Sequence, residues 1–324
     1  MFKFFRPGAA CALALCAALS TAAAGAYPER PVRLLVPFAP GGPTDLIGRV
    51  LAQQLTERWE KTIVVDNRAG AGGTIAVETA VKAAPDGYTV LFGSTSTFAV
   101  NPALYGKQSS DVVRDLPVVA FVAYAPQLLV VRSAVPAASV SELVALAKKQ
   151  PGKLTFASSG AGTTIHLAGE LFRHAAGIDI LHIPYKGGGP AVTAMLSGEV
   201  DMLFNNPGAL LPHIQTGRLR ALAVAGPGRS AFLPALPTFA EAGLPQVESG
   251  SAFGLAVPAA TPPVTVAAIG AALAGIVARP DFRDRLAGLG TEPLLMDAVQ
   301  SAAYVRREYA KWVEIVKVAN VKAE

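Results

Sequence analysis

The chain has 324 residues, a formal charge of +5 and two cysteines. So small a positive charge, without a basic run interleaved with aromatic residues, gives no support for nucleic-acid binding. Because Cys11 and Cys16 both lie in an N-terminal segment that we expect to be removed, the mature chain has no thiolate nucleophile and no cysteine metal site.

Residues 1–26 have the three parts of a secretory signal peptide. Lys3 and Arg6 form a charged start, an apolar centre follows, and Ala24-Gly25-Ala26 fits the small-residue cleavage rule. We therefore expect an exported protein whose mature chain begins near Tyr27.

Membrane attachment is the alternative role for this segment. Its apolar run is short for a bilayer span, and Leu15 is too large for the residue that precedes a lipidated cysteine such as Cys16. The later apolar stretch Val264 to Val277 is also too short to span. The mature chain, about three hundred residues, is long enough for two ordinary domains.

The stretch Leu34 to Asp45, LLVPFAPGGPTD, combines a buried strand, a glycine turn and the start of a helix that we expect Thr44 or Asp45 to cap. Such a turn leaves backbone N–H groups unpaired at the positive end of a helix, which suits an anion. Two further strands end in the glycine turn 68–74 and in a hydroxyl-rich loop, 94–97. Ligands bind outside the carboxyl ends of strands in open α/β sheets, so we expect these three turns to gather around one ligand.

A second lobe is predicted from the change of pattern at Pro126, which separates two apolar runs. A helix capped by Ser139 or Ser141 follows. The strand LTFAS then runs into the turn Ser158–Thr164 and another helix, which repeats the arrangement of the opening stretch.

The chain is expected to return to the first lobe near Ser251. Residues 226–250 are predicted to be a long surface connection, and a strand and two helices complete the chain. The alternation of strands and helices predicts an α/β fold. We expect lobe 1 at residues 27–126, an inserted lobe 2 at 127–250 and the return to lobe 1 at 251–324.

Neutral polar groups, and few acids or bases, follow the predicted strands. They are Ser94, Thr95, Ser96, Ser158, Ser159, Thr163, Asn205 and Asn206. The chain has no P-loop lysine pattern, no G-x-G-x-x-G and no G-x-S-x-G elbow. Its four histidines are scattered, and His166 and His174 are too far apart on one helix for a metal pair, so we interpret each as exposed or satisfied. A crevice of this kind favours binding a polar solute without transforming it, with no cofactor and no metal.

Six motifs of the mature chain occur together in a fixed order: YPERPVRLLVPFAPGGPTD, VVDNRAGAGGTIA, PDGYTVLFGS, LTFASSGAGTTIHLAGE, HIPYKGGGPA and GEVDMLF. With them the chain resembles the Bug-type substrate-binding proteins of bacterial tripartite tricarboxylate transporters. The resemblance implies a periplasmic binding protein of type II, in which two α/β lobes close by a hinge over a small carboxylated ligand. It also implies a monomer without enzymatic activity, whose partner is an integral membrane permease of large and small subunits.

The resemblance further implies the ligand-binding residues. In lobe 1 they are Phe38, Ala39, Gly41, Gly42 and Asp45 in the first turn, Ala71, Gly72 and Gly73 in the second, and Ser94 and Thr95 after the third strand. In lobe 2 they are Gly162, Thr163, Tyr185, Gly188 and Asn205. Backbone groups and ordered water at the second turn would hold one carboxylate, while Arg68 either contacts the ligand or pairs with Asp66.

We therefore expect a periplasmic receptor that captures a small carboxylated metabolite and delivers it to a permease. Two other hypotheses remain at this point. One is a ligand sensor that signals to a membrane kinase, which shares every sequence feature with the receptor. The other is an exported serine hydrolase that uses Ser94 or Ser159 with a distant histidine, against which the missing nucleophile elbow argues.

Overall fold

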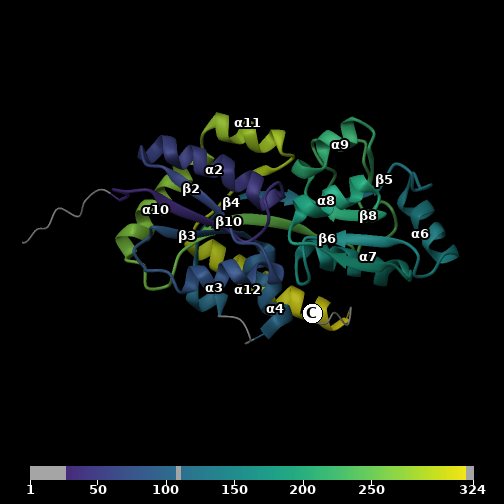
Figure 1. Cartoon of the computed structure of the whole chain (residues 1–324), viewed down its shortest axis with the longest axis horizontal. Coiled ribbons are helices and arrows are strands. Elements are labelled where there is room, and N and C mark those ends of the chain that lie inside the picture. The colour runs from purple at the N-terminus through teal and green to yellow at the C-terminus, as the bar shows by residue number, and fades with distance from the viewer. Residues whose placement is uncertain (1–26, 107–110, 319–324) are drawn as a thin grey trace, which may run out of the picture.

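The computed structural model describes residues 27–106 and 111–318. These residues form two β-sheets that lie side by side, each covered by helices (Figure 1). The predicted signal peptide and both cysteines lie outside the described residues. The α/β fold class expected from the sequence is confirmed.

The first sheet has six strands in the order β11-β4-β10-β3-β1-β2. Their bounds are β1 (Val32–Val36), β2 (Ile63–Asn67), β3 (Thr89–Ser94), β4 (Val118–Pro126), β10 (Gly250–Ala256) and β11 (Glu292–Met296). Strand β1 pairs in parallel with β2 and β3, whereas β10 runs antiparallel to β3 and β4. Because helices cover both faces, β1 is apolar at almost every position, as its sequence VRLLV predicts.

Helices pack on both faces of this sheet, and neighbouring residues of β1 point to opposite sides. Leu34 packs in a core with Leu51 and Ile276, and Leu35 packs in a separate core with Val77 and Val305. The first face therefore carries α2 (Pro43–Trp59), α10 (Pro263–Val277) and α11 (Pro280–Gly288), and the second carries α3 (Thr74–Val81) and α12 (Ala298–Val318).

The second sheet has five strands in the order β7-β6-β8-β5-β9. Their bounds are β5 (Leu128–Arg132), β6 (Thr155–Ser158), β7 (Leu181–Pro184), β8 (Met202–Asn205) and β9 (Leu219–Val224). Strand β6 pairs in parallel with β7 and β8. The covering helices are α6 (Val140–Lys149), α7 (Thr164–Ala176), α8 (Gly188–Ser197) and α9 (Leu211–Gln215). A core with Phe156, Phe172 and Phe204 fills this half of the molecule.

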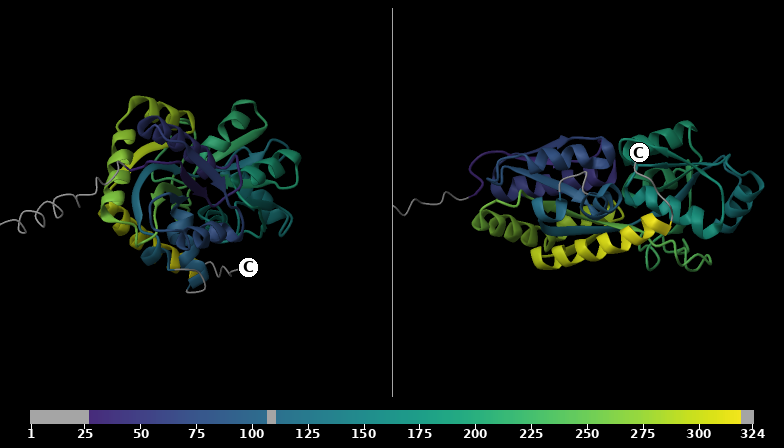
Figure 2. Two further views of the ribbon diagram at one scale, coloured as in Figure 1. Left: turned by 60° about the vertical axis from the view of Figure 1, so that its left-hand side comes forward. Right: turned by 90° about the horizontal axis from the view of Figure 1, so that it is seen from below.

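The chain passes between the two sheets at two neighbouring points. It leaves the first sheet at Gln127 and returns at Ser249, where the Gln127 amide donates a hydrogen bond of 3.2 Å to the Ser249 carbonyl oxygen. Asn206 Nδ2 donates to the carbonyl oxygen of Ala125 over 2.9 Å, beside the first crossing. Helix α12 runs along one side of the molecule (Figure 2), and its Trp312 packs in a cluster with Leu167 of α7.

Several elements differ from the sequence prediction. Gly42, not Thr44 or Asp45, is the N-cap of α2, because the helix already begins at Pro43. The expected hydroxyl loop is a π-helical turn, η3 (Ser96–Val100), that leads into α4 (Asn101–Tyr105).

The remaining elements are short. They are η2 (Ala71–Gly73), α5 (Val112–Asp115) and η5 (Pro207–Ala209). Helix α11 and edge strand β11 were not predicted, because their short sequences carry weak periodicity. Ser139 caps α6 and accepts a hydrogen bond from the Glu142 amide, as expected. In the described part of the chain no single helix is long and apolar enough to cross a membrane; α10 and α11 reach that composition only as a pair, bent by 73°.

Candidate functional site

Four helices begin at the crevice between the two sheets, each after a strand. Strand β1 leads to α2, β2 to α3, β6 to α7 and β7 to α8. Residues of all four helix N-termini line cavities in this crevice: Pro43, Gly73, Thr164 and Gly188. The first N–H groups of a helix have no intrahelical partner and carry partial positive charge. The crevice is therefore suited to a negatively charged group.

A small cavity of about 20 Å³, called the inner cavity here, lies in the crevice. It is lined by Phe38, Gly42, Pro43, Thr44, Ser94, Ser96, Ser159, Thr164, Ile165, Gly188, Asn206, Ser251 and Phe253. A water molecule needs about 10–15 Å³ of such volume, so this space is too small for a whole organic acid in the present conformation.

An outer cavity of about 230 Å³ lies against the inner one, and both are lined by Phe38 and Ser159. Its other lining residues are Gly70, Ala71, Gly72, Gly73, Tyr105, Gly160, Ala161, Pro184, Tyr185 and Lys186. Lys186 is the charged residue of this lining.

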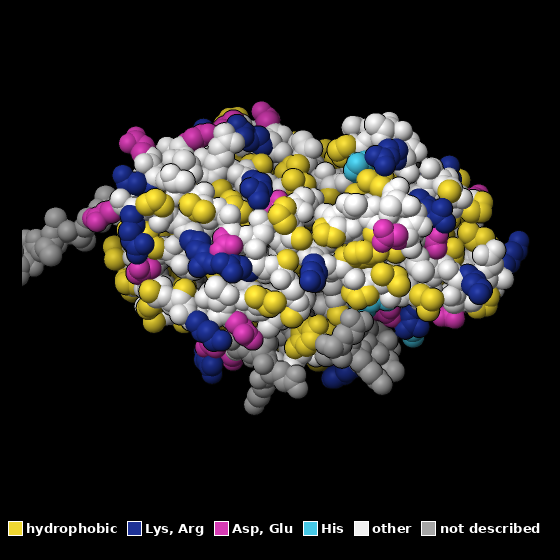
Figure 3. Space-filling view, viewed as in Figure 1, with side chains coloured by type: hydrophobic (Ala, Val, Ile, Leu, Met, Phe, Trp, Pro, Cys, Tyr) yellow, Lys and Arg dark blue, Asp and Glu magenta, His cyan; other side chains and the backbone are white. Residues whose placement is uncertain are grey.

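On the face of the molecule in Figure 3, Lys and Arg are spread singly or in small groups with acidic residues between them. The described residues form no single continuous basic patch on this face.

The turns of the two lobes touch each other across the crevice through backbone atoms. The Ala39 amide donates a hydrogen bond of 3.1 Å to the Lys186 carbonyl oxygen. A Cβ added at Gly189 would lie 2.4 Å from the carbonyl oxygen of Pro40, and one added at Gly72 would lie 2.6 Å from that of Ala161. Glycine is thus required at both contacts, because no side chain fits between the lobes.

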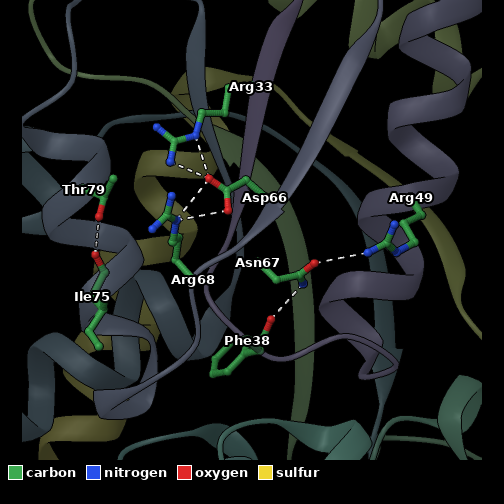
Figure 4. A network of polar contacts seen from close by, with 8 residues as sticks. All are labelled: Arg33, Phe38, Arg49, Asp66, Asn67, Arg68, Ile75 and Thr79. Carbon is green, nitrogen blue, oxygen red and sulfur yellow. Dashed lines mark hydrogen bonds and ion pairs between the residues drawn. The ribbon is translucent and has the colours of Figure 1, made fainter.

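Asp45 holds the first turn in place. Its Oδ2 accepts hydrogen bonds from the Gly41 amide at 2.9 Å and from Arg49 Nε at 3.0 Å. Asn67 Nδ2 donates to the Phe38 carbonyl oxygen (Figure 4) and to Asp45 Oδ1, each over 2.9 Å. Burial raises the pKa of Asp45, but the hydrogen bonds from Arg49, Gly41 and Asn67 outweigh it and hold the pKa below its ordinary value. Asp45 therefore supports the turn as a buried carboxylate.

Arg68 forms the ion pair that was one of its two expected roles. Its Nε lies 3.1 Å from both carboxylate oxygens of Asp66, and Arg33 Nε approaches the same carboxylate at 2.8 Å (Figure 4). Burial of Asp66 raises its pKa, yet the two arginines together hold it below the ordinary value. This network anchors the end of β2 just before the glycine turn.

Asn205 carries a buried hydrogen-bond donor without a partner among the described residues. The side chain is fully buried, its Oδ1 accepts a 2.9 Å hydrogen bond from the Asn206 amide, and Nδ2 has no acceptor. The Asn206 bond sets the orientation of the amide. A Cβ added at Gly188 would lie 3.0 Å from Asn205 Nδ2 and 2.9 Å from Pro43 Cδ. The free donor therefore lies where α2 and α8 begin, next to the inner cavity.

A network of hydroxyl groups forms the floor of the inner cavity and joins elements from both sheets. Thr164 Oγ1 lies 3.1 Å from Ser96 Oγ and 3.0 Å from Ser251 Oγ, and it receives a 2.9 Å hydrogen bond from Gln127 Nε2. All four side chains are buried. The floor is polar and neutral, as the sequence predicted for this region.

The structure separates the predicted site residues into two groups. Those that line a cavity are Phe38, Gly42, Ala71, Gly72, Gly73, Ser94, Tyr185 and Gly188. Those that lie behind the lining, in its supporting structure, are Ala39, Gly41, Asp45, Thr95, Gly162, Thr163 and Asn205.

Thr95 and Thr163 are used within the fold. Thr95 is fully buried, and its Oγ1 lies 2.9 Å from Tyr304 Oη and accepts a 3.0 Å hydrogen bond from the Ala252 amide. It therefore ties α12 to the first sheet, where the sequence suggested a ligand hydroxyl. Thr163 is the N-cap of α7 and accepts from the His166 amide.

Sequence reasoning missed several residues of the crevice. Ser251 and Phe253 come from β10, far along the chain, and no local motif signals their position. Asn101 lies at the start of α4, donates to the Gly72 carbonyl oxygen over 2.6 Å, and keeps a buried Oδ1 without a described partner. The asparagine just before a proline, Asn101-Pro102, was the one available signal in the sequence.

The described residues do not form the constellation required of a serine hydrolase. In the described residues no histidine hydrogen-bonds to Ser94 or Ser159. Ser158 Oγ does lie 2.7 Å from His182 Nε2, but Ser158 is fully buried and accepts from the Gly160 amide. No cluster of metal-ligating side chains occurs within residues 27–106 and 111–318.

Comparison with known proteins gives consistent matches. A model of the family described as "Tripartite tricarboxylate transporter family receptor" matches residues 47–321. The chain is 36% identical over 300 residues to the protein BugT of Bordetella pertussis, an overlap of 92% of each chain. It is 34% identical to the periplasmic binding protein BugD, with a TM-score of 0.88 over 92% of this chain and 100% of that one.

Two structures from Rhodopseudomonas palustris are also similar and were solved with ligands. One, with adipate, has a TM-score of 0.88 at 34% identity and covers 91% of this chain and 99% of its own. The other, MatC with bound malate, has a TM-score of 0.84 at 31% identity and covers 90% and 100%.

Proposed function

The chain belongs to the tripartite tricarboxylate transporter family of receptors, which are periplasmic solute-binding proteins and not enzymes, and we propose that it captures a small carboxylated metabolite between its lobes and delivers it to a membrane permease. The observation that carries the proposal is Asn205 Nδ2, a buried donor without a described acceptor at the meeting of α2 and α8. Leaving such a donor unpaired costs about 1–3 kcal/mol, which a ligand oxygen would recover.

The charge of the ligand follows from the same place. The N-termini of α2 and α8 both face this donor, and each adds partial positive charge from unpaired N–H groups. Neutral hydroxyls of Ser94, Ser96 and Ser251 complete the lining. A carboxylate oxygen satisfies these donors without requiring a fully buried arginine or lysine.

Capture depends on movement of the lobes about the two crossing points. We propose that lobe 1 comprises residues 27–126 and 251–324, and lobe 2 residues 127–250, with the hinge at Gln127 and Ser249. In the present conformation the turns meet through backbone atoms, so a ligand enters only when the lobes separate. Closure then buries the ligand and creates the surface that the permease recognises. Export through cleavage of residues 1–26 would place the receptor in the periplasm.

The ligand class is supported by the two related structures that hold adipate and malate. Both are small aliphatic dicarboxylates. The outer cavity of about 230 Å³ offers room for the body of an acid of this size, and the inner cavity offers the donors for one carboxylate.

The proposal is tested by thermal unfolding of the mature protein with a panel of mono-, di- and tricarboxylates, including adipate and L-malate. A ligand that binds only the folded state raises the melting temperature by mass action. We expect at least one acid to do so, and its amide or methyl ester not to. If no member of a broad carboxylate panel raises the melting temperature, the proposed ligand class is wrong.

A further inference from the structure

Two histidines that the proposed function does not use lie stacked behind the second-lobe turn, residues 158–164. His166 belongs to α7 and His182 to β7, and their ring centroids are 3.9 Å apart with an interplanar angle of 16°. The Phe156 ring also stacks with His182, with centroids 4.9 Å apart, and lies 6.4 Å from that of His166. His166 is buried and His182 half-buried, so both rings are part of the packed structure under the turn.

Each histidine is connected to one backbone amide of the turn. The Gly162 amide donates directly to His166 Nδ1 over 3.3 Å. The Gly160 amide donates to Ser158 Oγ over 3.1 Å, and that hydroxyl lies 2.7 Å from His182 Nε2. Gly160 and Gly162 have φ angles of 126° and 70°, in the region that favours glycine. Hydrogen bonds that lead to the two histidines therefore hold Gly160 and Gly162, two residues with backbone angles that favour glycine.

The same turn forms the contact surface of lobe 2. Gly160 and Ala161 line the outer cavity, and Ala161 contributes the carbonyl oxygen that approaches Gly72 of the other lobe. A shift of the Gly160 or Gly162 amide would therefore change both the cavity wall and the contact between the lobes.

We propose that His166 and His182 are positioning residues, a stacked pair of imidazoles that fixes the turn 158–164 in the shape that closes over the ligand. The role in ligand closure rests on the proposed function, whereas the fixing of the turn does not. The pair acts through hydrogen bonds to Gly162 and, by way of Ser158, to Gly160.

The hydrogen bond from the Gly162 amide requires His166 Nδ1 to be unprotonated, whereas Ser158 Oγ can accept from the Gly160 amide whichever partner donates in its bond with His182. A protonated imidazole has two donors and no acceptor, so protonation of His166 Nδ1 would break its bond to Gly162. Burial lowers the pKa of His166 to about 3, with a further decrease from His182 and Arg173, and burial lowers the pKa of His182 to about 4. Glu170 Oε1 lies 4.0 Å from His166 Nε2. The Glu170 carboxylate is paired with Arg173 at 2.7 Å, so it stabilises a protonated His166 less than a free carboxylate would.

Hydrogen exchange at the Gly160 and Gly162 amides tests the proposal without any ligand. The variant H166F keeps a planar ring but lacks the acceptor, and we expect exchange at Gly162 to accelerate about tenfold or more through local opening. H166N restores an acceptor close to the position of Nδ1 and is expected to recover most of the protection. H182F is expected to accelerate exchange at Gly160, and H174F, on the exposed side of the same helix, to change neither amide.

Protection of Gly162 in H166F equal to that in the wild type would overturn the proposal. If H166F does not fold, nitrogen NMR of the histidine rings in the wild-type protein decides. We expect His166 Nδ1 to be unprotonated at pH 5, where an ordinary histidine with a pKa near 6.5 carries a proton. A protonated His166 at that pH would refute it. Neither measurement uses a carboxylate, so failure of the ligand panel and failure of this proposal remain distinct.

Discussion

The backbone amide of Ala39 donates a hydrogen bond to the backbone carbonyl of Lys186 across the crevice, over 3.1 Å. The two residues belong to turns that follow β1 and β7, in different sheets. The bond forms because the neighbouring positions are glycines, which let the backbones of the two turns approach without side chains between them. In the proposed closure of the lobes, the volume at a few glycine positions would therefore control how closely the two turns approach.

The first prediction concerns this contact. In G189A the new Cβ would lie 2.4 Å from the Pro40 carbonyl oxygen, so the closed form must open slightly. Overpacking of this kind costs about 1–3 kcal/mol, which corresponds to a loss of affinity of about 5-fold to 150-fold. The measurement is calorimetric titration with an acid that stabilises the wild-type protein.

The ligand affinity of G189A is compared with that of two further variants. G42A introduces a milder contact, 3.2 Å from the Gly188 amide nitrogen, and is expected to lose less affinity. G228A is the control, since a Cβ there has no described atom within 4 Å. All three variants are expected to keep the far-ultraviolet circular dichroism of the wild type. Equal affinity of G189A and G228A would mean that the turns do not meet when ligand binds.

The second prediction separates an electrostatic role of Asn205 from a packing role. N205D keeps the Oδ1 acceptor for the Asn206 amide but replaces the free donor by a carboxylate oxygen. N205A loses both groups. If Nδ2 binds a ligand carboxylate, N205D is expected to bind more weakly than N205A, because it adds repulsion to the loss of a hydrogen bond worth about 1.5–3 kcal/mol. Binding by N205D that is tighter than by N205A would assign Asn205 to packing alone.

The third prediction uses the pH dependence of Asp45. Its pKa in the folded protein lies below its ordinary value of 3.8, so its ionised form contributes stability that is fully present above pH 3.8 and is lost as the pH falls through the folded pKa. We expect D45N to lower the free energy of unfolding by about 1–3 kcal/mol at pH 7. Urea unfolding at a series of pH values is expected to show this difference shrinking below pH 3.8. A difference that stays constant with pH would contradict the assigned role of the carboxylate.

The fourth prediction compares two neighbouring hydroxyls, Ser94 and Thr95. Ser94 lines the inner cavity, whereas Thr95 binds Tyr304 and the Ala252 amide. S94A is therefore expected to weaken ligand binding about 2-fold to 10-fold at unchanged stability, and T95V to lower the free energy of unfolding by about 1–3 kcal/mol at nearly unchanged affinity. Melting temperature and calorimetric affinity measured on both variants check this. The reverse pattern would indicate that Thr95, and not Ser94, contacts the ligand.

The comparison of these two hydroxyls illustrates what sequence reasoning predicts here and what it does not. Glycine turns such as Gly41-Gly42 are recognisable because a strand, a turn and a helix start follow each other within about a dozen residues. The two-sheet fold follows from the repetition of that unit. Whether Ser94 or Thr95 faces the ligand depends on Tyr304, more than two hundred residues away, and on the π-helical turn between them and α4.

The histidines show the same limit. His166 and His182 are scattered in sequence and were interpreted as satisfied or exposed side chains. The pairing of β6 with β7 places His182 opposite Phe156, from where its ring reaches Ser158, and α7 brings His166 onto the same ring stack. Such a pair depends on the register of two strands and the packing of a helix, neither of which can be read from local spacing.

A crystal structure of the mature protein with the acid that stabilises it most tests the central claim directly. The account predicts a carboxylate oxygen within hydrogen-bond distance of Asn205 Nδ2, at the N-termini of α2 and α8, with the body of the acid in the outer cavity. An acid bound outside the crevice, or one inside it that leaves Asn205 Nδ2 without a partner, would contradict the account.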